Sequence, residues 1–478
     1  MCISNKVKGV SSLKTVHSKV RRFIDQLKHF YSGEDVSYRF ILSLVFPVVL
    51  DQFFLVSFNF INTAMISSAG TTAVSAVSAV SMVGSLHFFL VNVFTAVGLG
   101  GTVLMAQYFG KKEMNQLSKV CSGTVYGAVL MALVISSLIA CFHQGILQLL
   151  FGHAEPLVLA NARLYLLGLL ASYPLQAVIE GTNGSLRGIG RTKASLKLSL
   201  LMNFVYIVGN VCFISILGMG MEGLVTSLLI SRFLGMLFAF YTLRTNRFLF
   251  LLKKEDFLHI QLHVITKVLK VSVPFAAESL FFNGGKIIIQ TMIVSFGTNV
   301  IATNAIASSW IQISEIIPSA LATSLVPIVG QCIGRENIAD AKKLIKTFVI
   351  TGMIAFLLVD LSLLPFFPLG MKLFNPPAAI LPEIYHLYLI AIVMHFLTWS
   401  IGFILPSALR AAGDANFTSL TSLLSMWIFR IGMGYFVGIV LGYGLTGIYF
   451  VMTLEWGIRG LIFLLRFKGK KWYQHQLT

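Results

Sequence analysis

The sequence predicts an all-α, polytopic membrane protein with twelve transmembrane helices in two pseudo-symmetric six-helix lobes. Composition is the first support, because 56% of the 478 residues are hydrophobic and only 11% are charged, whereas soluble proteins carry about 25% charged residues. The mean hydropathy is +0.84. The second support is a series of twelve apolar segments, each long enough to cross a bilayer. The third is an internal repeat that relates the two halves of the chain.

Residues 1–40 form a basic segment that precedes the first apolar run. Apolar residues recur in it at intervals of three and four: Val10, Leu13, Val16, Val20, Phe23, Ile24, Leu27 and Phe30. This spacing predicts an amphipathic cytoplasmic helix on the inner leaflet, and the alternative is a solvated, partly disordered tail. We expect no cleavable signal peptide, because the segment has no apolar core followed by small residues.

The twelve apolar segments fall into two sets of six. The first set lies near 41–67, 73–107, 120–142, 158–180, 195–217 and 222–243, and the second near 268–295, 300–333, 345–368, 384–406, 417–441 and 444–466. The second and eighth segments exceed the length of one crossing, so we expect them to tilt or bend. The predicted divisions are an N-lobe at 41–243, a charged cytoplasmic linker at 244–267, a C-lobe at 268–467 and a cytoplasmic tail at 468–478.

The basic residues predict how the chain is oriented. We place 30 of the 36 lysines and arginines on one side, so that alternate loops are basic and nearly uncharged. This is the positive-inside pattern, and it predicts a cytoplasmic (inner) membrane protein with both termini in the cytoplasm. The net charge of +18 therefore does not indicate nucleic acid binding. The five cysteines are scattered without a C-x-x-C pair, so no disulfide framework or metal site is expected.

The first apolar run, from Phe46 to Gly70, contains one carboxylate, Asp51, and two deeper amides, Asn59 and Asn62. A carboxylate inside a membrane segment usually faces a protein interior or a water-filled cavity. The eleven steps from Asp51 to Asn62 return to nearly the same helix face, about 16 Å along the axis. We therefore expect one polar stripe on this helix.

Landmarks of the first half recur in the second half in the same order. At an offset of 227, Pro47, Asp51, Asn59 and Gly70 correspond to Pro274, Glu278, Lys286 and Gly297; at 224, Gln107-x2-Gly110 corresponds to Gln331-x2-Gly334; and at 223, Arg187-x2-Gly190 corresponds to Arg410-x2-Gly413. A slowly drifting offset indicates two homologous halves, a common construction in secondary transporters.

These landmarks resemble the multidrug and toxic compound extrusion (MATE) family of cation-coupled antiporters over nearly everything after residue 40. The resembling motifs are Pro47…Asn62-Thr63-x-Met65-Ile66…Gly70, the two Gln-x2-Gly turns, the two Leu-Arg-x2-Gly loops that begin at Leu186 and Leu409, and the ending Trp456-Gly457-x-Arg459. The resemblance implies two lobes around a central cavity that opens alternately to each side. It also implies export of amphipathic organic compounds, often cationic or aromatic, against inward flow of H⁺ or Na⁺.

The chain departs from the family pattern where the resemblance implies an N-lobe cation site. Many members have an aspartate at the Asn62 position and an Asn-x3-Asp pair where this chain has Tyr206-x3-Asn210. Amides can ligate sodium but cannot take up a proton as a carboxylate does. The family's C-lobe glutamate also lies one turn deeper than Glu278, at Phe282.

We therefore predict a cation-coupling set of Asp51, Glu278, Asn62 and Asn210, with coupling moved to the two repeat-related carboxylates. A carboxylate in a low-dielectric site can switch its charge with one proton. The alternative is that Asp51 and Glu278 only pin neighbouring helices by hydrogen bonding. The other intramembrane carboxylates are Glu180, Glu315, Asp360 and Glu455.

Lys286 is unusual, because a lysine in a crossing needs a carboxylate partner or a wet cavity. Glu278 is about 12 Å away along the helix, so Asp51 or Glu315 is the expected partner. A fixed positive charge would disfavour simple cations and favour a zwitterionic, anionic or peptidic substrate. A structural ion pair is the alternative, and Arg430 carries the same ambiguity.

The remaining site predictions are a substrate cavity and a gate. The cavity set is Asn59, Tyr206, Lys286, Phe282, Gln290 and Arg430, and the gate or structural set is Arg187, Arg410, Pro47 and Pro274. Phosphate-binding loops, zinc-protease motifs and Ser/His/Asp arrangements are absent from the sequence. We therefore expect a transporter and not an enzyme, with no cofactor besides the coupling ion.

The expected partners are a small-molecule substrate and the lipid bilayer, and the expected state is a monomer. One alternative is an exporter or flippase of lipid-linked oligosaccharides or peptides from the same wider superfamily. Twelve crossings argue against it, since such proteins often have fourteen, whereas Lys286 and Arg430 favour it. A non-transporting membrane scaffold or receptor is the other alternative.

Overall fold

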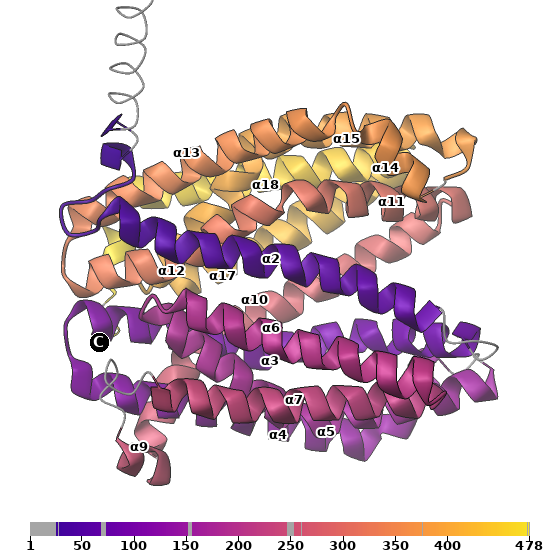
Figure 1. The fold of residues 1–478 in the computed structure, drawn as a ribbon. Helices are drawn as coiled ribbons and strands as arrows, with labels where there is room; N and C mark the ends of the chain where they lie inside the picture. The colour runs from indigo at the N-terminus through magenta and orange to yellow at the C-terminus, as the bar shows by residue number, and fades with distance from the viewer. Residues whose placement is uncertain are drawn as a thin grey trace, which may run out of the picture.

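The computed structural model describes residues 25–26, 28–67, 73–151, 155–245, 253–259, 261–374, 376–475 and 477. Across these residues the fold is helical and contains no strand (Figure 1). The side chains of residues 58–77 are not among those described. Residues 1–24, which make up most of the segment predicted to form an amphipathic helix, also lie outside the described residues.

The first half contains six long helices, one at each predicted apolar segment. They are α2 (Tyr38–Ser67), α3 (Ala73–Gly110), α4 (Met114–Phe151), α5 (Pro156–Gly188), α6 (Thr192–Asn210), which continues as the π-helical η2 (Val211–Ile216), and α7 (Gly220–Thr245). The helices α4 and α5 extend well beyond the predicted segments 120–142 and 158–180. A short helix, α9 (Lys254–Leu258), occupies part of the predicted linker.

The second half repeats this series with more interruptions. Its helices are α10 (Leu262–Val294), α11 (Thr298–Ser314), α12 (Ile316–Gly334), α13 (Ile338–Leu363), α14 (Phe367–Phe374), η3 (Ala378–Ile380), α15 (Leu381–Met394), η4 (His395–Ile404), α16 (Leu405–Ala411), α17 (Ala415–Ser425), η5 (Met426–Met433), η6 (Phe436–Val440), α18 (Gly444–Lys468) and η7 (Lys471–Tyr473). A break at Glu315 divides the long eighth segment into α11 and α12.

Eleven helices in the described part of the chain are long and apolar enough to cross a membrane. The twelfth predicted crossing is α10, which has 33 residues and carries Lys267, Lys270, Glu278 and Lys286. At 1.5 Å per residue it is about 50 Å long, which exceeds the roughly 30 Å of a hydrocarbon core. The charges, and not the length, separate α10 from the other eleven.

The helices form two bundles that lie side by side along their length (Figure 1). The bundle of α3 to α7 encloses an apolar core that includes Phe94, Leu104 and Tyr173. The bundle of α11 to α18 has two cores, one around Phe348 and Phe463 and one around Trp310 and Tyr388. Each bundle buries the apolar faces of its own helices, as membrane helices do when they pack closely.

Two helices, α2 and α10, cross between the bundles in opposite directions (Figure 1). Ile41 and Leu44 of α2 belong to the second-half core with Leu325. In return, Val264 and Val268 of α10 belong to the first-half core, whereas Ile289 and Ile293 near its other end lie in the second-half core. Residues on either side of the 244–267 linker therefore share the same apolar cores. The boundaries of the two lobes remain predictions from the sequence repeat.

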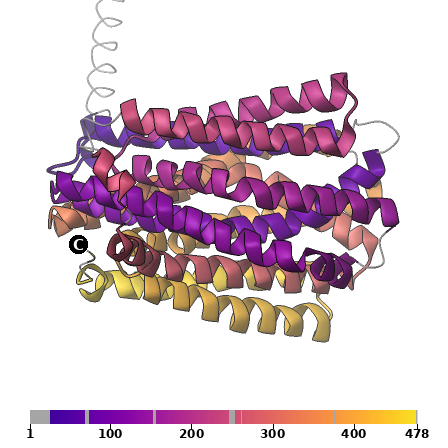
Figure 2. The same cartoon turned by 90° about the horizontal axis from the view of Figure 1, so that it is seen from below.

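The C-terminus lies at the end of the molecule where α2 begins (Figures 1 and 2). The C-terminal segment is held there by Asp414, which pairs with Arg466 at 2.7 Å and with His475 at 3.4 Å. At the same end, the Asp340 carboxylate accepts hydrogen bonds from the backbone N–H groups of Glu34 and Asp35. Both ends of the described chain are therefore anchored on second-half helices.

Candidate functional site

The second-half bundle contains a cavity of about 440 Å³. Its sixteen lining residues come from α10, α11, α12, α15, η4, η5 and α18, with Glu315 at the break between α11 and α12. Aromatic side chains form much of the wall: Phe282, Trp399, Phe403, Tyr449 and Trp456. This size and mixed lining are typical of a site for a small organic molecule.

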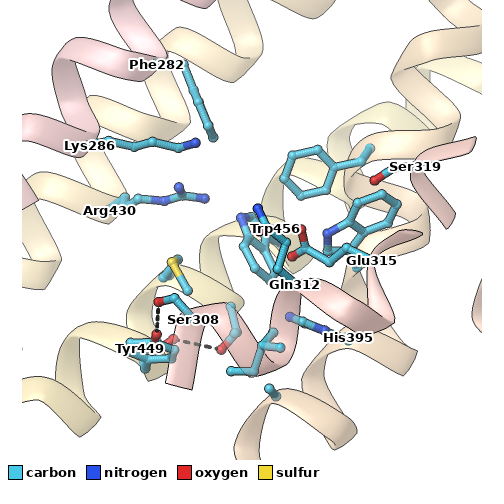
Figure 3. Close-up of a pocket in the computed structure, with 16 residues that line it drawn as sticks. Phe282, Lys286, Ser308, Gln312, Glu315, Ser319, His395, Arg430, Tyr449 and Trp456 are labelled. Carbon is cyan, nitrogen blue, oxygen red and sulfur yellow. Dashed lines mark hydrogen bonds between the residues drawn. The ribbon is translucent and has the colours of Figure 1, made fainter. Parts of the chain in front are cut away.

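Three predicted residues converge on this cavity, since Phe282, Lys286 and Arg430 all line it. Figure 3 shows Lys286 and Arg430 extending from the same side with their charged ends toward the same space, and Glu315 on the opposite side. The ring of Phe282 lies near both cations, with its centroid 5.0 Å from Lys286 Nζ and 5.1 Å from the Arg430 guanidinium carbon. The predicted Gln290 is exposed and is not among the lining residues.

Arg430 belongs to a buried ion network behind the cavity wall. Its Nη2 donates to Glu455 Oε2 at 2.5 Å, and Arg459 Nε lies 3.5 Å from Glu455 Oε1. The hydroxyl of Ser425 also donates to Glu455, at 2.7 Å. Because one carboxylate serves two guanidinium groups, the network keeps a positive charge in the bundle.

Lys286 has no carboxylate oxygen within 4.0 Å among the described residues. Asp51, one partner suggested by the sequence, pairs with Arg187 instead. Glu315, the other suggested partner, shares the cavity with Lys286. Lys286 therefore occupies a cavity and is not part of a direct structural ion pair.

The two repeat-related carboxylates each pair with an arginine of the same half. Asp51 Oδ2 lies 3.1 Å from Arg187 Nη2, and Glu278 Oε2 lies 3.2 Å from Arg410 Nη1. All four side chains are partly exposed. The internal repeat thus produces the same carboxylate–arginine pair twice. The sequence alone places the two carboxylates in the coupling set and the two arginines in the gate set.

Both arginines face one small space between the bundles. A cavity of about 160 Å³ is lined by Arg187 and Arg410 together with Thr102, Ser407 and six apolar or hydroxyl-bearing neighbours. One arginine of each ion pair therefore lies at this small cavity, so the two pairs meet at the junction of the halves. A change in charge at either carboxylate would act directly at the junction of the halves.

The bundles are closed against each other just beyond these pairs. Gln107 Nε2 donates to the carbonyl of Ala411 at 2.9 Å, and Gln331 Nε2 donates to the carbonyl of Gly188 at 3.1 Å. Each glutamine bonds to the other half, so the contact is reciprocal. We call this region, with its turns 111–113, 189–191, 335–337 and 412–414, the closed end.

Glycine allows this close approach of backbones. A Cβ on Gly110 would lie 2.3 Å from the carbonyl oxygen of Gln331, and one on Gly334 would lie 2.1 Å from that of Gln107. Any larger residue would force the halves apart at these points. The two Gln-x2-Gly turns noted in the sequence therefore form an interlocking pair.

The predicted N-lobe residues are only partly described. The side chains of Asn59 and Asn62 lie outside the described residues. Tyr206 and Asn210 lie one turn apart on α6. Asn210 is fully buried and immediately precedes the π-helical η2.

Pro47 and Pro274 of the predicted gate set lie inside α2 and α10. Both helices continue through the proline, so the repeat places one proline in each crossing helix. A proline inside a helix removes one backbone hydrogen bond and commonly introduces a kink.

Sequence reasoning did not assign several polar residues inside the two bundles to a site. Tyr449 and His395 line the second-half cavity, Arg459 completes its ion network, and Arg232 is a buried residue of the first half that donates to Ser172. Arg232 and Arg459 could have been found, because an arginine inside an apolar run signals a buried partner. Tyr449 and His395 carry no such signal in a single sequence.

Comparison with known proteins decides the family. The MatE family model matches residues 47–212 and 274–436, one match in each half. The chain belongs to the MATE family. Members of this family are membrane transporters, so the protein is a multi-pass transporter and not an enzyme. The two matches begin at Pro47 and Pro274, the first landmarks of the repeat.

Several bacterial transporters align over most of the chain. The uncharacterized transporter YisQ of Bacillus subtilis is 23% identical over 442 residues, covering 91% of this chain and 95% of its own. The probable multidrug resistance protein NorM of Listeria monocytogenes is 24% identical and covers 82% of this chain and 86% of its own.

Solved MATE structures share the fold at low sequence identity. An outward-facing multidrug resistance MATE family transporter of the MOP superfamily aligns with a TM-score of 0.81 at 17% identity, covering 90% of this chain and 94% of that one. A MOP superfamily transporter from Pyrococcus furiosus, whose binding pocket is described as reversed in polarity, aligns with a TM-score of 0.77 at 18% identity and the same coverage.

Proposed function

We propose that this MATE transporter exports amphipathic organic compounds by antiport with H⁺ or Na⁺ through alternating access. The observation that carries the proposal is the reciprocal closure of the two halves at one end, beside a pair of repeat-related ion pairs. Such a junction can open and close as a unit because both halves contribute the same parts. The word multidrug in the names of its NorM relatives supports the substrate class.

In this proposal the closed end faces the cytoplasm. The basic loops counted in the sequence include residues at this end, such as Lys111, Arg191 and Arg335, and basic loops favour the cytoplasmic side. The protein would then lie in the cytoplasmic membrane with both termini inside. It would act as a monomer without a cofactor, since each chain carries both halves of the closure.

Asp51 and Glu278 are the proposed coupling groups. An H⁺ or Na⁺ arriving from outside would neutralise the carboxylate and weaken its attraction for Arg187 or Arg410. The released arginine would loosen the cytoplasmic closure and favour opening toward the cell interior, where the ion leaves and substrate enters. Ion binding and substrate release on the outside would share the state in which this junction is closed, and ion release and substrate binding on the inside would share the state in which it is open.

Transport by reconstituted protein tests this proposal. Proteoliposomes holding a cationic dye, ethidium, or, separately, an anionic dye, dansylglycine, would be given a pH gradient or a sodium gradient, and the movement of each dye followed by fluorescence. We expect gradient-driven movement with wild type, and at least a tenfold slower rate with Asp51→Asn or Glu278→Gln. Glu222→Gln removes an exposed carboxylate on α7 and serves as the matched control.

The outcomes separate the parts of the proposal. Equal movement by wild type and both coupling variants would show that the coupling group lies elsewhere. If neither gradient moves dye, the export of amphipathic dyes is wrong, and lipid-linked or peptidic cargo becomes the next substrate class. Variants that do not reach the wild-type yield and elution profile would be replaced by Asp51→Glu and Glu278→Asp, which keep the charge and change its position.

A further inference from the structure

The cavity of the second half contains an excess of positive charge. Lys286 and Arg430 line it, and Arg459 lies behind its wall, against two carboxylates, Glu315 and Glu455. Glu455 is already bound by both arginines. Glu315 faces Lys286 and Arg430 from the opposite side of the cavity (Figure 3). A ligand in this space therefore meets two cationic groups on one wall.

The first of these groups, Lys286, lacks a carboxylate within 4.0 Å among the described residues. Its ammonium lies over the ring of Phe282 at 5.0 Å and is exposed to the cavity. A cation inside a membrane protein is stabilised by a counter-ion or by water. An anionic group in the cavity would supply the missing counter-ion.

The second group, Arg430, is nearly completely buried, with 3% of its side chain exposed. Its Nη2 is bound to Glu455, whereas its Nε is buried without a hydrogen-bond partner. A buried donor that lacks a partner is destabilising, particularly on a charged group. Arg430 therefore has unused donor capacity in the wall that Lys286 shares.

The rest of the wall suits an aromatic body. The rings of Phe282 and Trp456 flank the guanidinium of Arg430, at 5.1 and 5.6 Å from its central carbon. Tyr449, Phe403 and Trp399 continue the aromatic surface. The hydroxyl groups of Ser308 and Tyr449 share a hydrogen bond of 2.8 Å. Aromatic walls bind flat apolar ligands through offset and edge-to-face contacts.

We propose that this cavity binds an amphipathic aromatic compound that carries an anionic group, such as a carboxylate or sulfonate, held by Lys286 and Arg430. The proposal rests on the transport function proposed above and gives it a substrate class. A simple organic cation is disfavoured in the same position, because it meets two like charges in a low-dielectric site. Charge, and not size, is the selective property of this cavity.

Three dansyl probes of similar size test the charge preference. Dansylglycine is an anion, dansylamide is neutral and monodansylcadaverine is a cation. Binding to purified full-length protein in lipid nanodiscs would be followed by dansyl fluorescence. We expect affinity to decrease in the order anion, neutral compound, cation. A single charge-assisted contact is worth about tenfold or more in affinity.

Variants assign the preference to the cavity. Lys286→Met is expected to weaken dansylglycine binding about tenfold or more while changing dansylamide binding little. Lys286→Arg keeps the charge and should retain most of the affinity. Lys372→Met makes the same substitution at an exposed position on α14 and should match wild type. Arg430→Gln combined with Glu455→Gln removes the second cation without leaving a lone buried carboxylate.

Monodansylcadaverine binding as tightly as dansylglycine, or Lys286→Met binding dansylglycine like wild type, would overturn the proposal. Transport is measured separately with the same probes in proteoliposomes. If dansylglycine binds with the predicted preference but no gradient moves it, the transport proposal fails and the anion site stands. If ethidium is exported equally by wild type and Lys286→Met, and dansylglycine does not bind, transport stands and the anion site fails.

Discussion

At the residue scale, charge placement inside the bundles explains the two sites. Glu455 is fully buried between Arg430 and Arg459, so it holds two cations in place behind the cavity. Asp51 and Glu278, by contrast, are partly exposed and each hold one arginine. The buried carboxylate is suited to a permanent structural role, and the two accessible ones are suited to reversible neutralisation.

Glu455→Gln is expected to destabilise the protein strongly. It leaves two buried guanidinium groups without a counter-charge, and breaking a buried ion pair in this way costs about 3–5 kcal/mol. The thermal unfolding midpoint of the purified variant in detergent, followed by tryptophan fluorescence, measures the effect. Glu455→Gln combined with Arg430→Gln should recover part of the loss. A single variant as stable as wild type would contradict the structural role of Glu455.

At the element scale, the reciprocal contact of α3 and α12 sets how closely the halves approach. Each helix ends in a Gln-x2-Gly turn, in which the glutamine bonds to the other half and the glycine makes room for the opposing backbone. The helices α2 and α10 run through the same junction and carry the carboxylates. Closure is therefore a property of four helices that the repeat arranges in two equivalent pairs.

Gly334→Ala is expected to favour the state in which the closed end is open. Its Cβ would lie 2.1 Å from the carbonyl oxygen of Gln107, which is too close for an unshifted backbone. In a background without the five native cysteines, Ser407→Cys in the small inter-bundle cavity reports opening. A membrane-impermeant maleimide applied to inside-out vesicles should label it several-fold faster when Gly334→Ala is present.

Gly145→Ala provides the control, because a Cβ at that position meets nothing within 4 Å. It should leave the labelling rate of Ser407→Cys unchanged. An equal rate in the Gly334→Ala and Gly145→Ala backgrounds would mean that the Gln-x2-Gly contact does not limit opening.

At the scale of the whole molecule, the exchange of α2 and α10 joins the two halves into one folding unit. Each half supplies a helix that completes the apolar core of the other. The terminal segments strengthen the connection, because residues near Glu34 and His475 are both held by aspartates of the second half. Neither half on its own buries all of its apolar surface.

Splitting the chain between residues 245 and 253, in the linker that follows α7, should show this dependence. Each fragment expressed alone is expected to accumulate poorly, because its partner's helix is missing from the core. Coexpressed fragments should restore yield several-fold and copurify through a tag on only one of them. A fragment that accumulates alone in a monodisperse form, with no gain on coexpression, would contradict the exchange.

Much of the fold was predictable from the sequence because a bilayer imposes long apolar segments. Hydropathy predicted the apolar segments that form the helices. The repeat offset predicted the two halves and showed that Asp51 is equivalent to Glu278 and Arg187 to Arg410. Three members of the predicted substrate set, Phe282, Lys286 and Arg430, line one cavity, and their role in substrate binding stays a prediction. Apolar segments and repeat positions can be predicted in this way because both depend on the spacing of residues along the chain.

Other features were decided only by tertiary structure. The sequence assigned Asp51 and Arg187 to different roles. Only the packing of α2 beside α6, whose Ser195 also accepts a hydrogen bond from Arg187, shows that they form one ion pair. It also suggested Asp51 as a partner for Lys286, whereas the crossing of α2 and α10 leaves Lys286 facing a cavity. These contacts join residues more than a hundred positions apart, and hydropathy does not encode which faces of distant helices meet.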